Sequence, residues 1–302
     1  SNVDQCTELT NDQIEDYKAQ ARFLRAYFYW MLIKQWGPVP LLPDEGLDIN
    51  LSYEELSTPR NTYDECVDYI VAEFEEAAIH LEQERSTAYL GMATKGAALA
   101  ARAKVLLYAA SPLYNGNHDL FELKDEAGNP LINQNYDERK WARAAAAAEE
   151  VINTGWYELY TVPVSEETVL PPAEVRSREF PYGCGGIDPY ESYRQLFNGA
   201  IRDMKDNREF IFYRQFNNAG ATGGEDLIDL VKHSYPHNSG WDGWNTNAVS
   251  LKQVDAYYMF DGRDKDNASE GYPYHEDGFI TADDADSIYK FVNRASEEKY
   301  QV

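Results

Sequence analysis

The stretch GMATKGAALAARAKVLLYAASPLYNG, residues 91 to 116, decides the fold of this chain. A helix is expected to start near Thr94, and an alanine-rich run extends as far as Ala110, where Ser111-Pro112 provides a natural stop. Small side chains at a contact allow two helices to approach each other closely. The stretch therefore predicts a helix that packs closely against its neighbours.

A long helix is predicted near the N-terminus. Thr10 and Gln13 have the spacing of a capping box, in which each side chain accepts a hydrogen bond from the backbone of the other residue. Apolar residues then recur with a helical period until Gly37-Pro38 ends the run. Trp36 stands at this turn, and we interpret it as a plug of the core.

A second helix is predicted to begin with another capping pair, Thr62 and Glu65. Its apolar residues form one stripe from Val67 to Leu81, which is the pattern of a helix with one buried face. We assign the acidic residues of this region to a solvated face: Glu73, Glu75, Glu76 and Glu82.

A further helix is expected from about Glu138 to Asn153, ending at Gly155. Helices of this length, rich in alanine and joined in antiparallel pairs, are typical of tetratricopeptide-type repeats, although the strict signature of that repeat is absent. We therefore predict a mainly α fold, in which tetratricopeptide-like helical hairpins form a scaffold over residues 1–160.

The second half of the chain has a different composition. It is rich in Gly, Pro, Asn and aromatic residues and has little helical period. We expect residues 161–302 to be an irregular, loop-rich segment with a few short strands, packed on the scaffold and carrying the ligand site. The clearest strand is predicted at Glu209–Phe216, which is composed largely of Phe, Ile and Tyr.

The charge excludes some classes of partner. The chain has 52 acidic and 27 basic side chains, a net charge of −25. This charge repels phosphate backbones and anionic head groups, so neither nucleic acid nor a membrane surface is an expected partner. The three cysteines, Cys6, Cys66 and Cys184, predict neither a disulfide framework nor a zinc site. The composition fits a neutral ligand.

Three stretches in order resemble the SusD/RagB family of outer-membrane nutrient-binding lipoproteins. They are residues 91 to 116, AQARFLRAYFYWMLIKQWGPVPLLPDE at 19 to 45, and NREFIFYRQF at 207 to 216 followed by SLKQVDAYYMFDGRD at 250 to 264. The resemblance implies non-catalytic capture of oligosaccharide or polysaccharide at the cell surface. It also implies delivery to a SusC-like, TonB-dependent transporter, with the full-length protein lipid-anchored to the outer membrane.

Members of that family are longer than this chain, so we expect the chain to be an internal portion. No signal peptide or lipobox precedes Cys6, and we interpret this cysteine as an ordinary residue and not the lipid anchor.

A neutral sugar needs flat aromatic faces together with groups that satisfy its hydroxyls. HSYPHNSGWDGWNTN, residues 233 to 247, has this composition. The candidate ligand residues in it are Tyr235, His237, Trp241, Asp242, Trp244 and Asn245. A second reading remains open, in which the two Trp side chains hold the loop on the helical core.

PYGCGGIDPYESYRQLFNG, residues 181 to 199, is a second candidate. Tyr190, Tyr193 and Asn198 are its candidate ligand residues, with Arg194 beside them. Packing of these side chains inside the fold is the alternative reading.

No catalytic arrangement is recognisable, so we expect no enzyme and no cofactor. The oxygen-rich group Asp261, Asp264, Asp266 and Asn267 would suit a structural calcium ion, although its spacing is not that of an EF-hand. Two other functions remain open: an all-helical glycoside hydrolase or lyase, and a tetratricopeptide-type scaffold that binds peptides.

Overall fold

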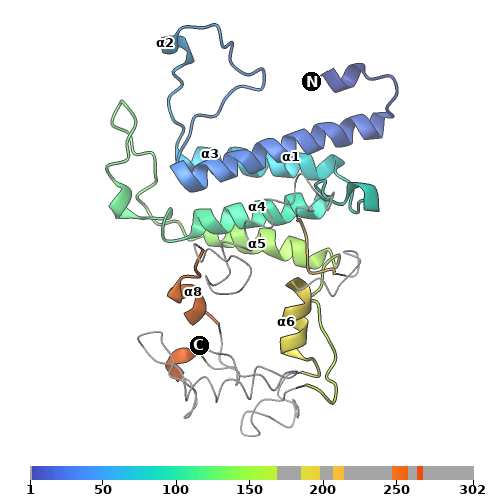
Figure 1. Cartoon of the computed structure of the whole chain (residues 1–302). Helices are drawn as coiled ribbons and strands as arrows, with labels where there is room; N and C mark the ends of the chain where they lie inside the picture. Colours follow the sequence, from blue (N-terminus) through green and yellow to red (C-terminus); the bar gives the residue numbers. More distant parts are fainter. Residues whose placement is uncertain (1, 169–184, 198–206, 214–246, 258–263, 268–302) are drawn as a thin grey trace. The chain divides into compact units, whose positions relative to one another are not determined.

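The computed structural model describes residues 2–168, 185–197, 207–213, 247–257 and 264–267 (Figure 1). The chain divides into two compact units, Ser1–Glu158 with Arg208–Gln215, and Leu159–Asn207 with Phe216–Val302. The assignment of residues 1–160 to a scaffold and 161–302 to ligand binding stays a prediction. The helical elements are η1 (Asn2–Gln5), α1 (Asn11–Trp36), α2 (Tyr53–Leu56), α3 (Tyr63–His80), η2 (Thr87–Tyr89), α4 (Lys95–Ala110), η3 (His118–Leu120), α5 (Arg139–Asn153), α6 (Pro189–Phe197), α8 (Leu251–Asp255) and η6 (Lys265–Asn267).

The predicted helix boundaries of the first unit are confirmed. Thr10 caps α1 and Thr62 caps α3, each in a complete capping box. Thr94 caps α4 by accepting a hydrogen bond from the Ala97 N–H. Gly37 ends α1 with φ at 69°, in the left-handed region that favours glycine. Local signals therefore fix where these helices begin and where the first one ends.

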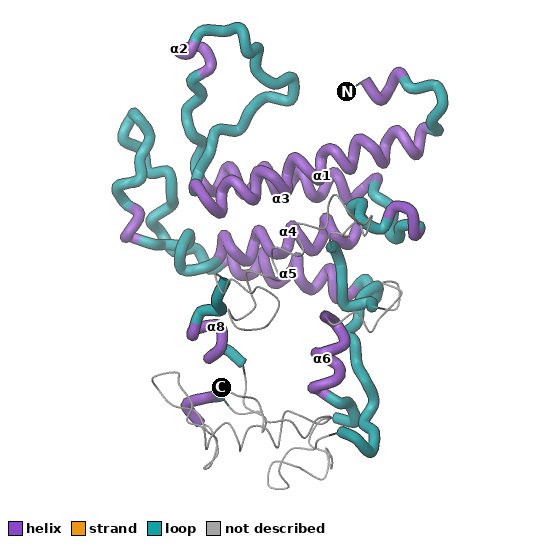
Figure 2. The backbone as a smooth tube through the Cα atoms, in the orientation of Figure 1, coloured by secondary structure: helices purple, strands orange, loops and turns teal. Residues whose placement is uncertain are grey.

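The four long helices pack in chain order, α1 on α3, α3 on α4 and α4 on α5, as antiparallel neighbours (Figures 1 and 2). Their shared core is centred on large side chains with almost no exposed surface, among them Phe23, Ile33, Ile70, Phe74 and Val105. The predicted mainly α fold with tetratricopeptide-like hairpins is confirmed. Among the described residues no strand forms, and the only ladder pairings are the isolated bridges Lys124–Pro130 and Pro163–Ile187.

The assignment of Glu73 to a solvated face is wrong. Its side chain is only 10% exposed and faces α1. Arg25 binds it with the Nε and Nη2 atoms, at 3.2 and 2.6 Å from Oε2, and Arg22 donates to Oε1 at 3.3 Å. A carboxylate is tolerated at this depth because two guanidinium groups compensate its lost hydration. The triad ties α1 to α3.

The interpretation of Trp36 as a core plug is also wrong, because 67% of this residue is exposed. It is the last residue of α1 and precedes the turn at Gly37, where the chain leaves the helix. Pro38, two residues later, is the fully buried side chain of this turn.

The strand predicted at Glu209–Phe216 does not form in its described part, which consists of turns and bends up to Tyr213. Instead, the Phe212 ring packs edge-on against Phe23, with ring centroids 5.3 Å apart. Arg208 donates from its guanidinium to the carbonyls of Gly155 and Trp156. Phe212, one of the aromatic residues that suggested a strand, is therefore held by side-chain packing on α1.

Two further observations concern the described part of the chain. No helix in it is long and apolar enough to cross a bilayer. Cys6 and Cys66 are free thiols, and burial raises the pKa of the Cys66 thiol. Cys184 lies outside the described residues.

Candidate ligand-binding surface

The second unit positions helix α6 through a buried carboxylate. Asp188, which is 1% exposed, precedes the helix and accepts the Glu191 N–H at 2.9 Å. Its second oxygen accepts the Thr168 hydroxyl at 2.7 Å. An Asp at this position caps a helix by satisfying one of the N–H groups that have no partner within the helix. The start of α6 is thereby fixed to the segment that contains Thr168.

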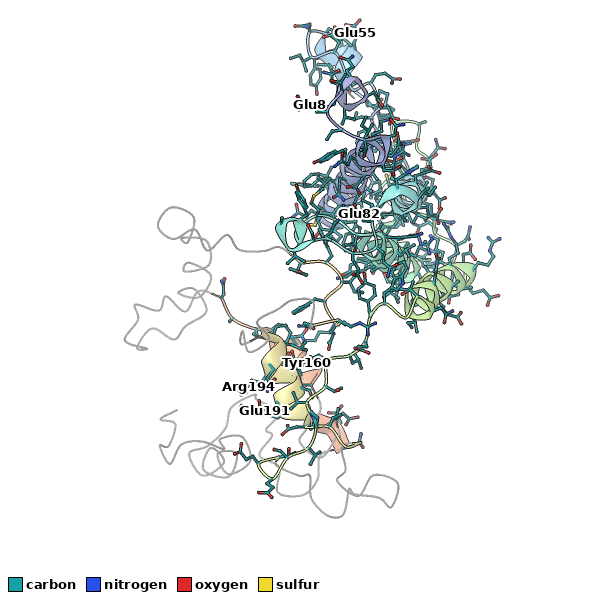
Figure 3. All side chains as sticks on the ribbon, turned by 90° about the vertical axis from the view of Figure 1, so that its right-hand side faces the viewer. Glu8, Glu55, Glu82, Tyr160, Glu191 and Arg194 are labelled. Atoms are coloured by element: carbon teal, nitrogen blue, oxygen red, sulfur yellow. The ribbon has the colours of Figure 1, made fainter. Side chains whose placement is uncertain are left out.

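The same segment holds one face of α6. The backbone N–H of Asp188 donates to the Val162 carbonyl at 2.7 Å, and the Val162 N–H donates to the Ser192 hydroxyl at 2.8 Å. One turn further, the Tyr160 hydroxyl donates to Oε1 of Gln195 at 2.8 Å. Figure 3 shows Tyr160 beside α6. Because this side of the helix is occupied, the residues between these anchors point outward.

An aromatic surface lies on and beside this helix, and we define it as Tyr190, Tyr193 and Phe197 of α6 together with Tyr257. Their exposed fractions are 44%, 54%, 66% and 53% respectively. The Tyr193 ring lies edge-on to Phe197, with centroids 5.3 Å apart, and to Tyr257, with centroids 6.4 Å apart. The hydroxyls of Tyr193 and Tyr257 are 3.1 Å apart and share a hydrogen bond. Such mutual contacts hold Tyr193, Phe197 and Tyr257 in place while more than half of each residue stays exposed.

The charged groups beside this surface are paired with each other. The Arg194 guanidinium donates to Glu191 at 2.8 Å, and the same carboxylate oxygen accepts Gln195 (Figure 3). The hydrogen bond to Glu191 raises the pKa of Arg194, and the hydrogen bond to Tyr257 raises the pKa of Tyr193. The raised pKa keeps the Tyr193 hydroxyl protonated near pH 7. The surface offers apolar ring faces and hydroxyl groups.

Of the predicted ligand residues, Tyr190 and Tyr193 are exposed on α6, as a ligand contact requires. Asn198, Tyr235, His237, Trp241, Asp242, Trp244 and Asn245 lie outside the described residues, and their roles stay predictions. Phe197 and Tyr257 were missed. Phe197 follows Tyr193 by four positions, a spacing that places both on one face of a helix and that the sequence contained.

The first unit contains a groove of about 480 Å³ between α3 and α5, with buried side chains of α4 in its floor. Ion pairs join its two walls: Lys140 to Asp64 at 2.6 Å, and Arg143 to Asp68 at 2.9 Å. A tetratricopeptide scaffold for peptides would need charges that are free to meet a ligand. Here these cations are neutralised across the groove, so the groove does not favour that function.

Nothing in the described ranges gathers three or more His, Cys, Asp or Glu side chains in a geometry that could hold a metal ion. Within the group proposed for calcium, Asp264 accepts two hydrogen bonds from Asn267, each 2.8 Å long. Asp261 lies outside the described residues. The structural calcium ion stays a prediction.

Residues 2–107 match the family model described as "Starch-binding associating with outer membrane", a SusD-like family. This likeness covers about a third of the chain. The matched residues include α1, α3 and most of α4, and of these α1 and α4 overlap the stretches quoted for the resemblance. The matched family is described as starch-binding and associated with the outer membrane. The search of curated proteins finds no match.

Solved structures have a similar fold. The structure named BT4246 is 25% identical, with a TM-score of 0.61, and the match covers 87% of this chain and 45% of that one. A SusD-like protein of Bacteroides fragilis NCTC 9343, BF3747, is 22% identical with a TM-score of 0.52, covering 88% and 40%. A SusD-like carbohydrate-binding protein of the same strain, BF0978, is 17% identical with a TM-score of 0.52, covering 87% and 38%. The last two likenesses support the fold alone. The chain spans less than half the length of each of the three.

Proposed function

We propose that this chain captures neutral oligosaccharide without catalysis, and that the aromatic surface on α6 and at Tyr257 is part of the capture site. In the full-length protein, lipid-anchored at the outer membrane, the captured glycan passes to a SusC-like, TonB-dependent transporter. The observation that carries the capture role is the exposed, mutually fixed group of Tyr193, Phe197 and Tyr257.

The physical argument rests on what a sugar offers. A pyranose ring presents C–H faces that stack on aromatic rings, and hydroxyls that need donors and acceptors. The aromatic surface supplies both, because each Tyr has an apolar face and a polar tip. Rings that are already held by edge contacts lose little conformational freedom when a ligand binds. Capture needs no more than this.

Isothermal titration calorimetry with malto-, cello-, xylo- and manno-oligosaccharides tests the proposal. We expect at least one series to bind. Tyr193→Ala removes the ring that touches both Phe197 and Tyr257, and should weaken that binding about tenfold, since a stacking ring contributes roughly 1.5 kcal/mol. Tyr193→Phe keeps the ring and should retain most of the affinity.

Tyr136→Ala is the matched control, because Tyr136 is also largely exposed, at 65%, but belongs to the first unit. Unfolding midpoints of all three variants should equal that of the parent. If Tyr193→Ala binds as tightly as the parent, or if no series binds, the aromatic surface is not a glycan site.

Absence of turnover is the second part of the proposal. A glycosidase needs a general acid whose pKa is raised. In the first unit, hydrogen bonds lower the pKa of five carboxyl groups, which is the opposite of what a general acid needs: Asp48, Glu55, Glu65, Asp125 and Asp137. We expect no new reducing ends when bound oligosaccharide is incubated with the chain. Turnover that disappears on replacing one carboxylate would establish an enzyme.

A further inference from the structure

A pocket of about 210 Å³ lies in the first unit, where α1 begins and α3 ends. Figure 3 labels Glu82, one of the residues in its wall. The pocket is formed by the first turns of α1, the end of α3 and the connection to α4. Its lining residues are Asp12, Gln13, Asp16, Tyr17, His80, Glu82, Arg85, Tyr89 and Met92.

Arg85 organises one wall of this pocket. Its side chain is 5% exposed, and its guanidinium donates to both oxygens of Asp16, at 2.9 and 2.7 Å. It also donates to Glu82 at 3.1 Å, and twice to the Ala93 carbonyl at 3.1 and 2.8 Å. A guanidinium with this many partners is rigid, so both carboxylates are held in place.

A second anchor holds the same connection. The Gln20 amide donates to the Ala93 carbonyl at 2.7 Å and accepts the Ala93 N–H at 2.9 Å. This pair closes the connection onto α1, so that Tyr89 and Met92 are carried to the pocket by a fixed backbone. The wall is therefore prepared before any ligand arrives, which lowers the entropic cost of binding.

Two tyrosines supply the apolar part. Tyr17 is 43% exposed on α1, and Tyr89 is 56% exposed at the end of η2. Both residues line the pocket, and half-exposed rings in such a place are suited to stacking. The outer part of Glu82, whose side chain is 62% exposed, supplies acceptors for hydroxyl groups beside the rings.

We infer that this pocket is a second carbohydrate-binding site, which takes one neutral pyranose ring. Its volume is below the roughly 300–1,000 Å³ of pockets that hold drug-sized molecules, so one ring suits it better than a longer chain. Asp12, Asp16 and Glu82 outnumber the single buried guanidinium, and their excess negative charge disfavours sulfated or uronic sugars. Capture at two places on one chain would raise the avidity for a polymer beyond that of either site.

Saturation-transfer NMR with the same neutral oligosaccharides tests this site in the parent chain and in three variants. The Tyr193→Ala variant, in which the pocket is unchanged, should still give saturation transfer to sugar protons. Adding Tyr17→Ala together with Tyr89→Ala should reduce that signal at least fivefold. The matched control is Tyr53→Ala, which removes a tyrosine 86% exposed on α2, away from the pocket lining, and should leave the signal unchanged.

The experiment distinguishes the second site from the aromatic surface. If Tyr193→Ala abolishes all transfer, or if the double replacement of Tyr17 and Tyr89 changes nothing, the second site is refuted while the aromatic surface stands. Choline is the competing probe, because aromatic rings beside carboxylates also attract quaternary ammonium groups. Transfer to choline without transfer to any sugar would likewise refute the inference. The inference is supported if replacing Tyr17 and Tyr89 by Ala removes the saturation transfer to sugar while the fold is unchanged.

Discussion

Replacement of Glu73 by Gln removes one charge from the centre of the α1–α3 contact without changing the shape of the side chain. In the parent, three guanidinium hydrogen bonds converge on this carboxylate, from Arg22 at 3.3 Å and from Arg25 at 3.2 and 2.6 Å. After the replacement, two guanidinium groups face a neutral amide in a site that water reaches poorly.

The size of the effect follows from burial. Breaking a fully buried ion pair costs about 3–5 kcal/mol. Glu73 is 10% exposed, but Arg22 and Arg25 are 39% and 32% exposed, and Arg25 keeps a second partner in Asp44 at 2.6 Å. Water and Asp44 therefore recover part of the loss, and we expect a decrease in the free energy of unfolding of about 2 kcal/mol.

Urea unfolding followed by circular dichroism measures this difference, with Glu76→Gln as the control. Glu76 is on the same helix, three residues away and exposed, and its replacement should change the free energy of unfolding by less than about 0.5 kcal/mol. Equal effects of the two replacements would show that Glu73 is solvated after all. If Glu73→Gln increases the free energy of unfolding, the desolvation of Glu73 costs more free energy than its ion pairs with Arg22 and Arg25 supply.

Two other predictions concern the first unit. Gly96→Ala would place a methyl group against the Tyr157 ring and hydroxyl, so it should lower the free energy of unfolding by at least about 2 kcal/mol, whereas Gly91→Ala, which meets open space, should not. Hydrogen bonds from Arg139 lower the pKa of Asp137 to about 2, so the benefit of this pair is present above the ordinary carboxyl pKa and disappears as pH falls from about 4 to 2. NMR titration of the Asp137 carboxyl should show a midpoint near 2, and Arg139→Ala should return it towards the ordinary value; an unchanged midpoint would refute the assigned cause.

The sequence predicted those features of the fold that are encoded within a few residues. The capping pairs at Thr10 and Thr62 fixed helix starts, because the donors and acceptors concerned are three positions apart. Burial of Glu73 depends on which helix lies alongside, and that is not a local property. A hint was nevertheless present, since Glu73 lies three residues after Ile70 and four before Ala77, on the side of the apolar stripe that is buried.

The candidate site was predicted only in part for the same reason. Tyr193 was identified from the composition of residues 181 to 199, but its partner Tyr257 lies 64 positions away in the sequence. No spacing rule connects two such residues. The strand expected at Glu209–Phe216 does not form up to Tyr213 for a related reason: the aromatic content favoured a strand, but Phe212 packs on Phe23, which is distant in the sequence.

The arrangement of arginines explains how a strongly acidic chain can present neutral ligand surfaces. In the first unit, Arg25, Arg85 and Arg102 are directed inward and tie helices or connections together through carboxylates. Cations used in this way are not available on the surface, where the excess of carboxylates repels anions and keeps the chain well hydrated. The affinity of a neutral sugar does not depend on that field, because it comes from contacts with ring faces and hydroxyls. If the chain captures glycan as proposed, its selectivity for uncharged glycans follows from the same charge distribution that holds the hairpins together.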